Sequence, residues 1–233
     1  MTVINDFLSL IYPRHCEACG RIMRGHEHYI CFHCRLNLPK SNYHTMAVSP
    51  MYMAFAGRVP LVMACSYYLY EKSGKVQRLL HAIKYEQQSD LASFLGKQYA
   101  RDLAHTGVFE GIDLIVPIPL HEKKLKQRGY NQSECFAAGL SEGLNKQVDT
   151  SHLQRIVETS TQTRKRKYER WENVEGIFSV NEPEALYGKH VLLVDDVVTT
   201  GATIESAWLA LKEVPEVKVS VASIAFADKH SSY

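Results

Sequence analysis

Residues 191–203 read VLLVDDVVTTGAT, and this stretch decides the expected fold. Its leading apolar residues, Val191–Val194, predict a buried strand of a parallel sheet. Asp195 and Asp196 follow directly, then a loop of threonine and glycine, then a run whose apolar residues have helical spacing. A strand, two carboxylates, a small-residue loop and a helix N-terminus together favour a site for a phosphorylated sugar.

Each part of this stretch has a physical role at such a site. Free backbone N–H groups at the helix start, with the helix dipole behind them, attract a phosphate. Glycine lets the backbone come close and threonine hydroxyls add hydrogen bonds, so the expected phosphate loop comprises Thr199, Thr200, Gly201, Ala202 and Thr203. Asp195 and Asp196 can accept hydrogen bonds from two adjacent ribose hydroxyls. For the acidic pair alone a second interpretation stays open, since acidic residues after a strand often only cap the next helix.

A second informative feature is a pair of Cys-x-x-Cys turns near the start of the chain, separated by eleven residues. Zn²⁺ prefers four soft ligands in a tetrahedron, and each turn presents two thiolates on one side. So short a segment cannot build an adequate apolar core, and a metal would contribute about 10–16 kcal/mol of folding free energy. Disulfides or a redox pair fit less well, because secretory and thioredoxin-like features are missing. We therefore expect structural zinc on Cys16, Cys19, Cys31 and Cys34.

The same segment combines basic and aromatic side chains. Its basic residues outnumber Glu17 and Glu27, and they are Arg14, Arg21, Arg24, Arg35 and Lys40. Tyr29 and Phe32 add aromatic faces. Aromatic faces beside a basic rim are the chemistry that binds single-stranded nucleic acid. The alternative, left equally open, is that these residues pack the segment onto the next domain.

Composition narrows the function classes. The chain has 233 residues and a formal net charge of +2, so any contact with nucleic acid has to be local. No apolar run reaches the length of a membrane span. The opening segment lacks the basic start and cleavage site of a signal peptide, so we expect a cytoplasmic protein. Neither a Walker A loop nor a GxGxxG fingerprint occurs in the chain.

Apolar patterns along the rest of the chain alternate between strands and helices, which predicts an α/β fold with a mostly parallel sheet. Strands are expected at 61–70, 113–119, 152–157, 176–180, 191–194 and 217–226, and helical spacing occurs at 76–83, 93–104, 136–144 and 204–211. We expect three parts: an N-terminal helix with the cysteine module, a linker or irregular segment crossing the larger domain, and the α/β domain, at 1–40, 41–60 and 61–233.

Two loops of the larger domain are strongly basic. Residues 120–131 follow the strand expected at 113–119, and Arg128 beside Gly129 suits an anion cradle, because ligands of open α/β sheets bind at the carboxyl ends of strands. The second loop, 159–170, has no apolar periodicity and should be mobile. Its basic residues include Arg164, Lys165, Arg166 and Lys167. For each loop a solvated basic surface is the alternative.

The opening stretch resembles the phosphoribosyl diphosphate (PRPP) signature of the type I phosphoribosyltransferases. Further motifs are the cysteine module, the pair Lys84-Tyr85, the sequence RGYNQ at 128–132 and the sequence WENVEGIF at 171–178. With them, nearly the whole chain is similar to the ComF/ComFC family, including its GntX-like members. The resemblance implies a zinc ribbon joined to a type I phosphoribosyltransferase-like domain.

Carried over by position, the resemblance also implies roles for particular residues. Asp195 and Asp196 meet the ribose hydroxyls, residues 199–203 hold the 5-phosphate, and Arg128 meets the pyrophosphate. Residues 159–170 close over PRPP, Mg²⁺ accompanies PRPP, and the four cysteines bind zinc.

The family is associated with natural transformation, in handling single-stranded DNA that has entered the cytoplasm. The resemblance therefore implies single-stranded DNA as a partner, together with DNA-uptake or helicase proteins. A metabolic phosphoribosyltransferase that transfers ribose 5-phosphate to a small acceptor is the alternative, and a PRPP-sensing regulator is a third. No segment is recognisable as a nucleobase pocket, so the acceptor, the catalytic residues and the occurrence of catalysis stay open.

Overall fold

The computed structural model describes residues 13–25, 27–157 and 176–228. One sheet is formed by β1 (Leu61–Leu69), β2 (Leu114–Pro117), β3 (Gln147–Val148), β6 (His190–Val198) and β7 (Lys218–Phe226). These strands pair in parallel in the order β1-β7-β6-β2-β3. A separate antiparallel pair is formed by β4 (Leu153–Arg155) and β5 (Phe178–Val180). The expected α/β class with a mostly parallel sheet is confirmed.

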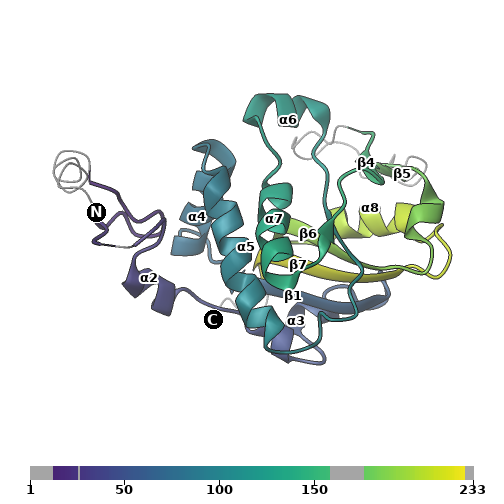
Figure 1. The fold of residues 1–233 in the computed structure, drawn as a ribbon, viewed down its shortest axis with the longest axis horizontal. Helices are drawn as coiled ribbons and strands as arrows, with labels where there is room; N and C mark the ends of the chain where they lie inside the picture. The colour runs from purple at the N-terminus through teal and green to yellow at the C-terminus, as the bar shows by residue number, and fades with distance from the viewer. Residues whose placement is uncertain (1–12, 26, 158–175, 229–233) are drawn as a thin grey trace.

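The helices are α2 (Phe32–Asn37), α3 (Pro50–Met53), α4 (Lys75–Tyr85), α5 (Ser89–Ala104), α6 (Glu122–Arg128), α7 (Gln132–Leu144) and α8 (Ala202–Leu211), with short 3-10 turns at Tyr43–Thr45 and Pro183–Leu186. In Figure 1 the cysteine module lies beside α4 at one end of the molecule, and α6 stands at the top of the view. Among the described helices, none is long and apolar enough to cross a membrane.

Strand β6 lies in the middle of the sheet because its first half is apolar on both faces. Val191–Val194 are fully buried, and Val191 pairs with Leu114 of β2 and with Val219 of β7. The strand is longer than its apolar run predicts, since pairing with β7 continues through both aspartates to Val198. The acidic pair therefore lies within the strand, near the carboxyl end of the sheet.

Two segments without clear apolar periodicity are more ordered than the sequence indicates. Residues 120–131, predicted as a loop, contain the two-turn helix α6, which has no buried residue and therefore no apolar stripe to reveal it. Residues 41–60 cross the α/β domain, where α3 packs on β1 and buries Met51. The Ser49 hydroxyl starts α3 by accepting the Tyr52 N–H, and it also donates to the Ala64 carbonyl of β1. The N-terminal helix expected before the cysteines lies outside the described residues.

Helices α5 and α7 approach each other closely because glycines lie where they cross. A Cβ atom on Gly139 would overlap the Ser93 carbonyl oxygen, and one on Gly96 would overlap the Phe136 carbonyl oxygen. Helix α7 in turn packs against β6 and β2. This packing places the first turn of α7, which carries Ser133, next to the acidic pair of β6.

Candidate functional site

The acidic pair of β6 is held by groups from two different helices. Asp195 Oδ1 accepts hydrogen bonds from the Ser133 hydroxyl of α7 at 3.2 Å and from the Asp196 backbone N–H at 2.8 Å. Asp196 Oδ2 lies 2.9 Å from Lys84 Nζ, in the last turn of α4. Both partners of this ion pair are largely shielded, with side-chain exposures of 12% for Asp196 and 22% for Lys84. The two carboxylates therefore belong to a built cluster at the carboxyl end of the sheet.

The protonation of this cluster is unusual. Burial, and next the Asp196 carboxylate, raise the pKa of Asp195 to about 7, although the Asp196 N–H, Lys84 and Ser133 act in the opposite direction. Near neutral pH the Asp195 side chain is thus present in both protonation states. It can either accept or donate a hydrogen bond toward a sugar hydroxyl.

The loop after β6 has the geometry of a phosphate cradle. Gly201 has φ +79° and directly precedes α8, and as the N-cap residue it offers no side chain, while Thr200 Oγ1 accepts the Ala202 N–H at 3.4 Å. The interpretation of the acidic pair as a helix cap is wrong, because the two carboxylates bond Ser133, the Asp196 N–H and Lys84 instead. The N–H groups of the first turn beyond Ala202 can bind a ligand. Thr199 and Thr200 are exposed, while the Arg58 guanidinium donates to the Thr200 carbonyl at 3.2 Å and pairs with Glu205 of α8 at 2.7 Å.

Gly201 is required by packing as well as by its backbone conformation. A Cβ atom at this position would lie 2.5 Å from Cε1 of Phe55, which is buried below the loop. Residues before β1 therefore support the loop from beneath, and the predicted loop residues Thr199, Thr200, Gly201, Ala202 and Thr203 lie together at the start of α8.

The motif RGYNQ is mostly structural. Gly129 ends α6 with φ +81°, and Asn131 caps α7 by accepting the Ser133 N–H at 3.1 Å. The Asn131 amide also donates to the Ile118 carbonyl at 3.0 Å. The Tyr130 hydroxyl donates to the Ile83 carbonyl near the end of α4. These contacts fix α6 and α7 relative to α4 and to the end of β2.

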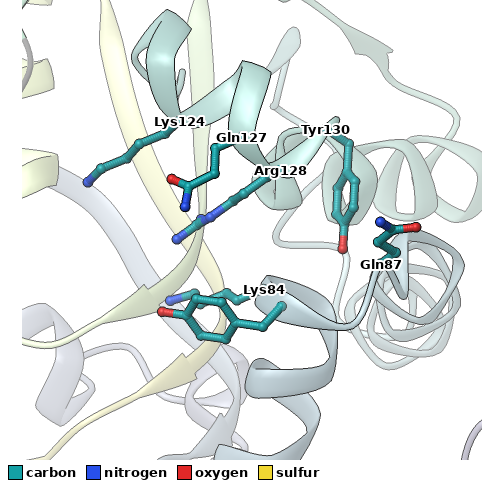
Figure 2. Close-up of a pocket in the computed structure, with 7 residues that line it drawn as sticks. Lys84, Gln87, Lys124, Gln127, Arg128 and Tyr130 are labelled. Carbon is teal, nitrogen blue, oxygen red and sulfur yellow. The ribbon is translucent and has the colours of Figure 1, made fainter.

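Arg128 and Tyr130 of this motif line a cavity, and Arg128 brings a positive charge to it. The Arg128 guanidinium lies over the Tyr85 ring, 5.7 Å from the ring centroid. The cavity has a volume of about 400 Å³, and its lining residues are Lys84, Tyr85, Gln87, Lys124, Gln127, Arg128 and Tyr130. Figure 2 shows Lys124 and Arg128 extending from α6 to the same side of the view as Lys84, which lies at the end of α4. The predicted cradle residue Arg128 thus lines the same cavity as Lys84, and the Lys84 ammonium pairs with Asp196 of the acidic pair.

The residues assigned to the site from the sequence do not include Lys84 and Ser133, which contact the acidic pair. The pair Lys84-Tyr85 stood out only as a motif after a helical run, and nothing in its spacing points to Asp196. Ser133 follows RGYNQ directly, but its contact with Asp195 spans 62 residues of sequence. The basic residues Arg164, Lys165, Arg166 and Lys167 of the second loop lie outside the described residues.

The four cysteines of the N-terminal module come together. Their sulfur atoms all lie within 4.8 Å of one another, none is in a disulfide, and Cys19 Sγ is 3.8 Å from Cys31 Sγ. A tetrahedron with metal–sulfur bonds of about 2.3 Å has sulfur–sulfur edges of about 3.8 Å. The Cys31 backbone N–H donates to Cys16 Sγ at 3.3 Å, and a thiolate sulfur can accept such a hydrogen bond. The cluster, which includes Cys34, is compatible with a closed zinc site.

The module packs on the α/β domain through some of the residues that suggested nucleic-acid binding. Tyr29 lies against Phe94 of α5, with ring centroids 5.4 Å apart. Lys40 pairs with Asp102 of α5 at 2.7 Å. Phe32, in contrast, is 66% exposed and lines a surface cleft of about 680 Å³ together with Arg21, Ile22, Arg24, Glu27, Cys31 and His33. The packing interpretation therefore holds for Tyr29 and Lys40, and Phe32 stays accessible.

Comparison with known protein families agrees with this arrangement. Residues 135–233, which contain most of α7, β6 with its acidic pair, and α8, match the phosphoribosyl transferase domain. The chain is thus an α/β protein with a mostly parallel sheet and a four-cysteine module, and its residues 135–233 are similar to phosphoribosyl transferase domains.

Curated relatives bear names that refer to DNA utilization and to competence. The chain is 34% identical over 138 residues to DNA utilization protein YhgH of Escherichia coli K12, covering 58% of this chain and 60% of that protein. It is 31% identical to Competence protein F of Haemophilus influenzae, covering 54% and 55%, and 35% identical to Competence protein ComFC of Bacillus subtilis, covering 43% and 38%. The expected resemblance to the ComF/ComFC family is confirmed, and the match spans less than two thirds of each of these relatives.

Proposed function

We propose that the chain binds PRPP or a related 5-phosphoribosyl ligand at the carboxyl end of its sheet. The observation that carries this proposal is the convergence of the glycine-preceded start of α8, two carboxylates in β6 and a cationic cavity next to them. Residues 199–203 hold the 5-phosphate, Asp195 and Asp196 hold the ribose hydroxyls, and Arg128 with Gly129 serves the pyrophosphate.

Two metals belong to this proposal. Mg²⁺ accompanies the pyrophosphate of the ligand and neutralises part of its charge. Zn²⁺ occupies the four-cysteine cluster, whose sulfur spacing fits a tetrahedral site, and there it stabilises a module too small to fold on its own core.

The cellular role that we propose is the handling of single-stranded DNA during natural transformation, in the cytoplasm and together with DNA-uptake or helicase proteins. Relatives named for competence and DNA utilization support this role. The cleft of the cysteine module supports it chemically, because Phe32 offers a stacking face while Arg21 and Arg24 offer phosphate contacts. The basic residues 164–167 are further candidates for phosphate contacts.

A metabolic phosphoribosyltransferase is the second candidate, and one observation favours it. A second cavity, of about 490 Å³, is lined by Thr199 and Thr200 of the phosphate loop together with Met53 of α3 and Phe226 at the end of β7. Its volume falls within the range of small-molecule pockets. A small acceptor bound there would lie next to the phosphoribosyl ligand.

Binding of PRPP is tested by calorimetry with and without Mg²⁺. The double variant Asp195→Asn/Asp196→Asn should abolish binding while leaving the fold intact, and Glu142→Gln, which removes an exposed carboxylate of α7, should bind as the parent does. Equal binding by the parent and the double variant would refute the assignment of the site.

The two cellular roles are separated by two further measurements. Affinity for a labelled single-stranded oligonucleotide should fall with salt, with a log–log slope of about −0.7 per phosphate contact, and Phe32→Ala should weaken it. Pyrophosphate release from PRPP is measured with nucleobases, with amines and with single-stranded DNA. Release that needs a small acceptor, without any DNA binding at low salt, favours the metabolic role.

A further inference from the structure

The cationic cavity is built for a multiply charged anion. Among the described residues, its lining includes three cations, Lys84, Lys124 and Arg128, and no carboxylate. The remaining lining residues, Tyr85, Gln87, Gln127 and Tyr130, carry hydrogen-bonding groups. A volume of about 400 Å³ admits a diphosphate, and two elements distant in sequence, the end of α4 and helix α6, contribute its charges (Figure 2).

Lys84 differs from the other two cations because it also reaches the acidic pair. Its ammonium lies 2.9 Å from Asp196 Oδ2, yet 22% of its side chain is exposed and lines the cavity. An ammonium group has three N–H donors, so its contact with Asp196 leaves donors for a second partner. Lys84 therefore lies between the part of the site that faces ribose hydroxyls and the part that faces phosphates.

The position of Lys84 is held from several sides. Tyr130 donates to the Ile83 carbonyl in the same turn of α4, and Arg128 covers the ring of Tyr85. Lys84 approaches the cavity from an ordered helix rather than from a loop, so little side-chain and backbone freedom remains to be lost when an anion binds.

We infer that Lys84 is a binding residue for the diphosphate of the ligand, bridging a phosphate oxygen in the cavity to the Asp196 carboxylate. This inference rests on the proposed function, and it adds a residue outside the phosphoribosyl signature. Arg128 and Lys124 complete the anion site from α6. The positive charge of Lys84 is shared between the two halves of the site, so the carboxylate pair can lie beside a polyanion without unscreened repulsion.

Two halves of PRPP serve as separate probes in the test. Pyrophosphate and ribose 5-phosphate are titrated by calorimetry against the full chain, the variants Lys84→Met and Lys84→Arg, and the control Lys97→Met. The control removes a lysine of α5 that pairs with the exposed Glu142, so it changes net charge equally. Because Lys84→Met leaves Asp196 unpaired, Lys84→Met/Asp196→Asn is measured as well, and thermal melts followed by circular dichroism verify that each variant is folded.

Lys84→Met is expected to weaken pyrophosphate binding about tenfold to a hundredfold, the range for one charge-assisted hydrogen bond, with or without Asp196→Asn. The affinity of Lys84→Met for ribose 5-phosphate should differ from that of the parent by less than about threefold, which is well below the loss expected for pyrophosphate. Lys84→Arg should restore most of the loss, and Lys97→Met should show none. Unchanged pyrophosphate binding in Lys84→Met, or an equal loss for both probes, would overturn the inference while the proposed function stands. A parent chain that binds neither probe would overturn both.

Discussion

Replacing Gly201 by alanine tests whether the loop after β6 depends on its backbone conformation and on close packing at the same time. The residue has φ +79°, which costs a residue with a Cβ atom about 1–2 kcal/mol. Its Cβ atom would also lie 2.5 Å from Phe55 Cε1 and 3.0 Å from Cζ, and overpacking of this kind costs about 1–3 kcal/mol. The free energy of unfolding should therefore fall by about 2–5 kcal/mol.

Gly188→Ala is the matched control for this experiment. Gly188 has φ +64°, but nothing lies within 4 Å of its would-be Cβ atom, so it carries only the backbone cost of about 1–2 kcal/mol. Urea unfolding followed by circular dichroism measures both variants, and calorimetry with ribose 5-phosphate measures the loop. We expect Gly201→Ala to lose ligand binding and Gly188→Ala to keep it.

A double-mutant cycle isolates the clash. In the Phe55→Ala background the ring is absent, so adding Gly201→Ala should cost about 1–3 kcal/mol less than it does in the parent chain. The reasoning would be refuted if Gly201→Ala and Gly188→Ala were equally destabilising, or if Phe55→Ala left the cost of the substitution unchanged.

Three further predictions concern the module, the acidic pair and the helix crossing. Cys34→Ser should lower bound zinc from about one ion per chain to near zero and destabilise the module, as measured by metal analysis and hydrogen exchange; a variant that retains the metal would contradict this. Asp195 has its pKa raised from 3.8 to about 7, so its contribution to stability is complete below pH 4 and is lost as the pH rises to about 7. Asp195→Asn removes the titrating group, so the difference in unfolding free energy between this variant and the parent should grow by about 1 kcal/mol per pH unit between pH 4 and about pH 7. A difference that does not change with pH would contradict the raised pKa. Gly139→Ala should lower the melting temperature by about 6–12 °C, the shift for a loss of about 3 kcal/mol, because the new methyl group meets the Ser93 carbonyl; a near-parental melting temperature would show that the helices can separate without cost.

Sequence reasoning succeeded where the chemistry is local. The run Val191–Val194 predicted a buried strand, and the following loop and helix start lie where the pattern placed them. The cysteine turns predicted their own convergence, because two Cys-x-x-Cys turns can complete a tetrahedron only by meeting. Reasoning from periodicity failed at α6, whose residues bury no apolar face, and at the end of β6, where the pairing with β7 continues beyond the two polar aspartates to Val198.

The sequence by itself determined the fold class, the cysteine cluster and the site elements of β6 and α8, since each follows from residues close together in the chain. Only the tertiary structure decided which residues complete the site. The ion pair between Lys84 and Asp196, the hydrogen bond from Ser133 to Asp195 and the contact of Phe55 below Gly201 join segments from three regions of the chain. Such contacts depend on how the helices pack on the sheet. The apolar pattern of one segment does not encode this packing, because packing depends on the shapes of both surfaces that meet.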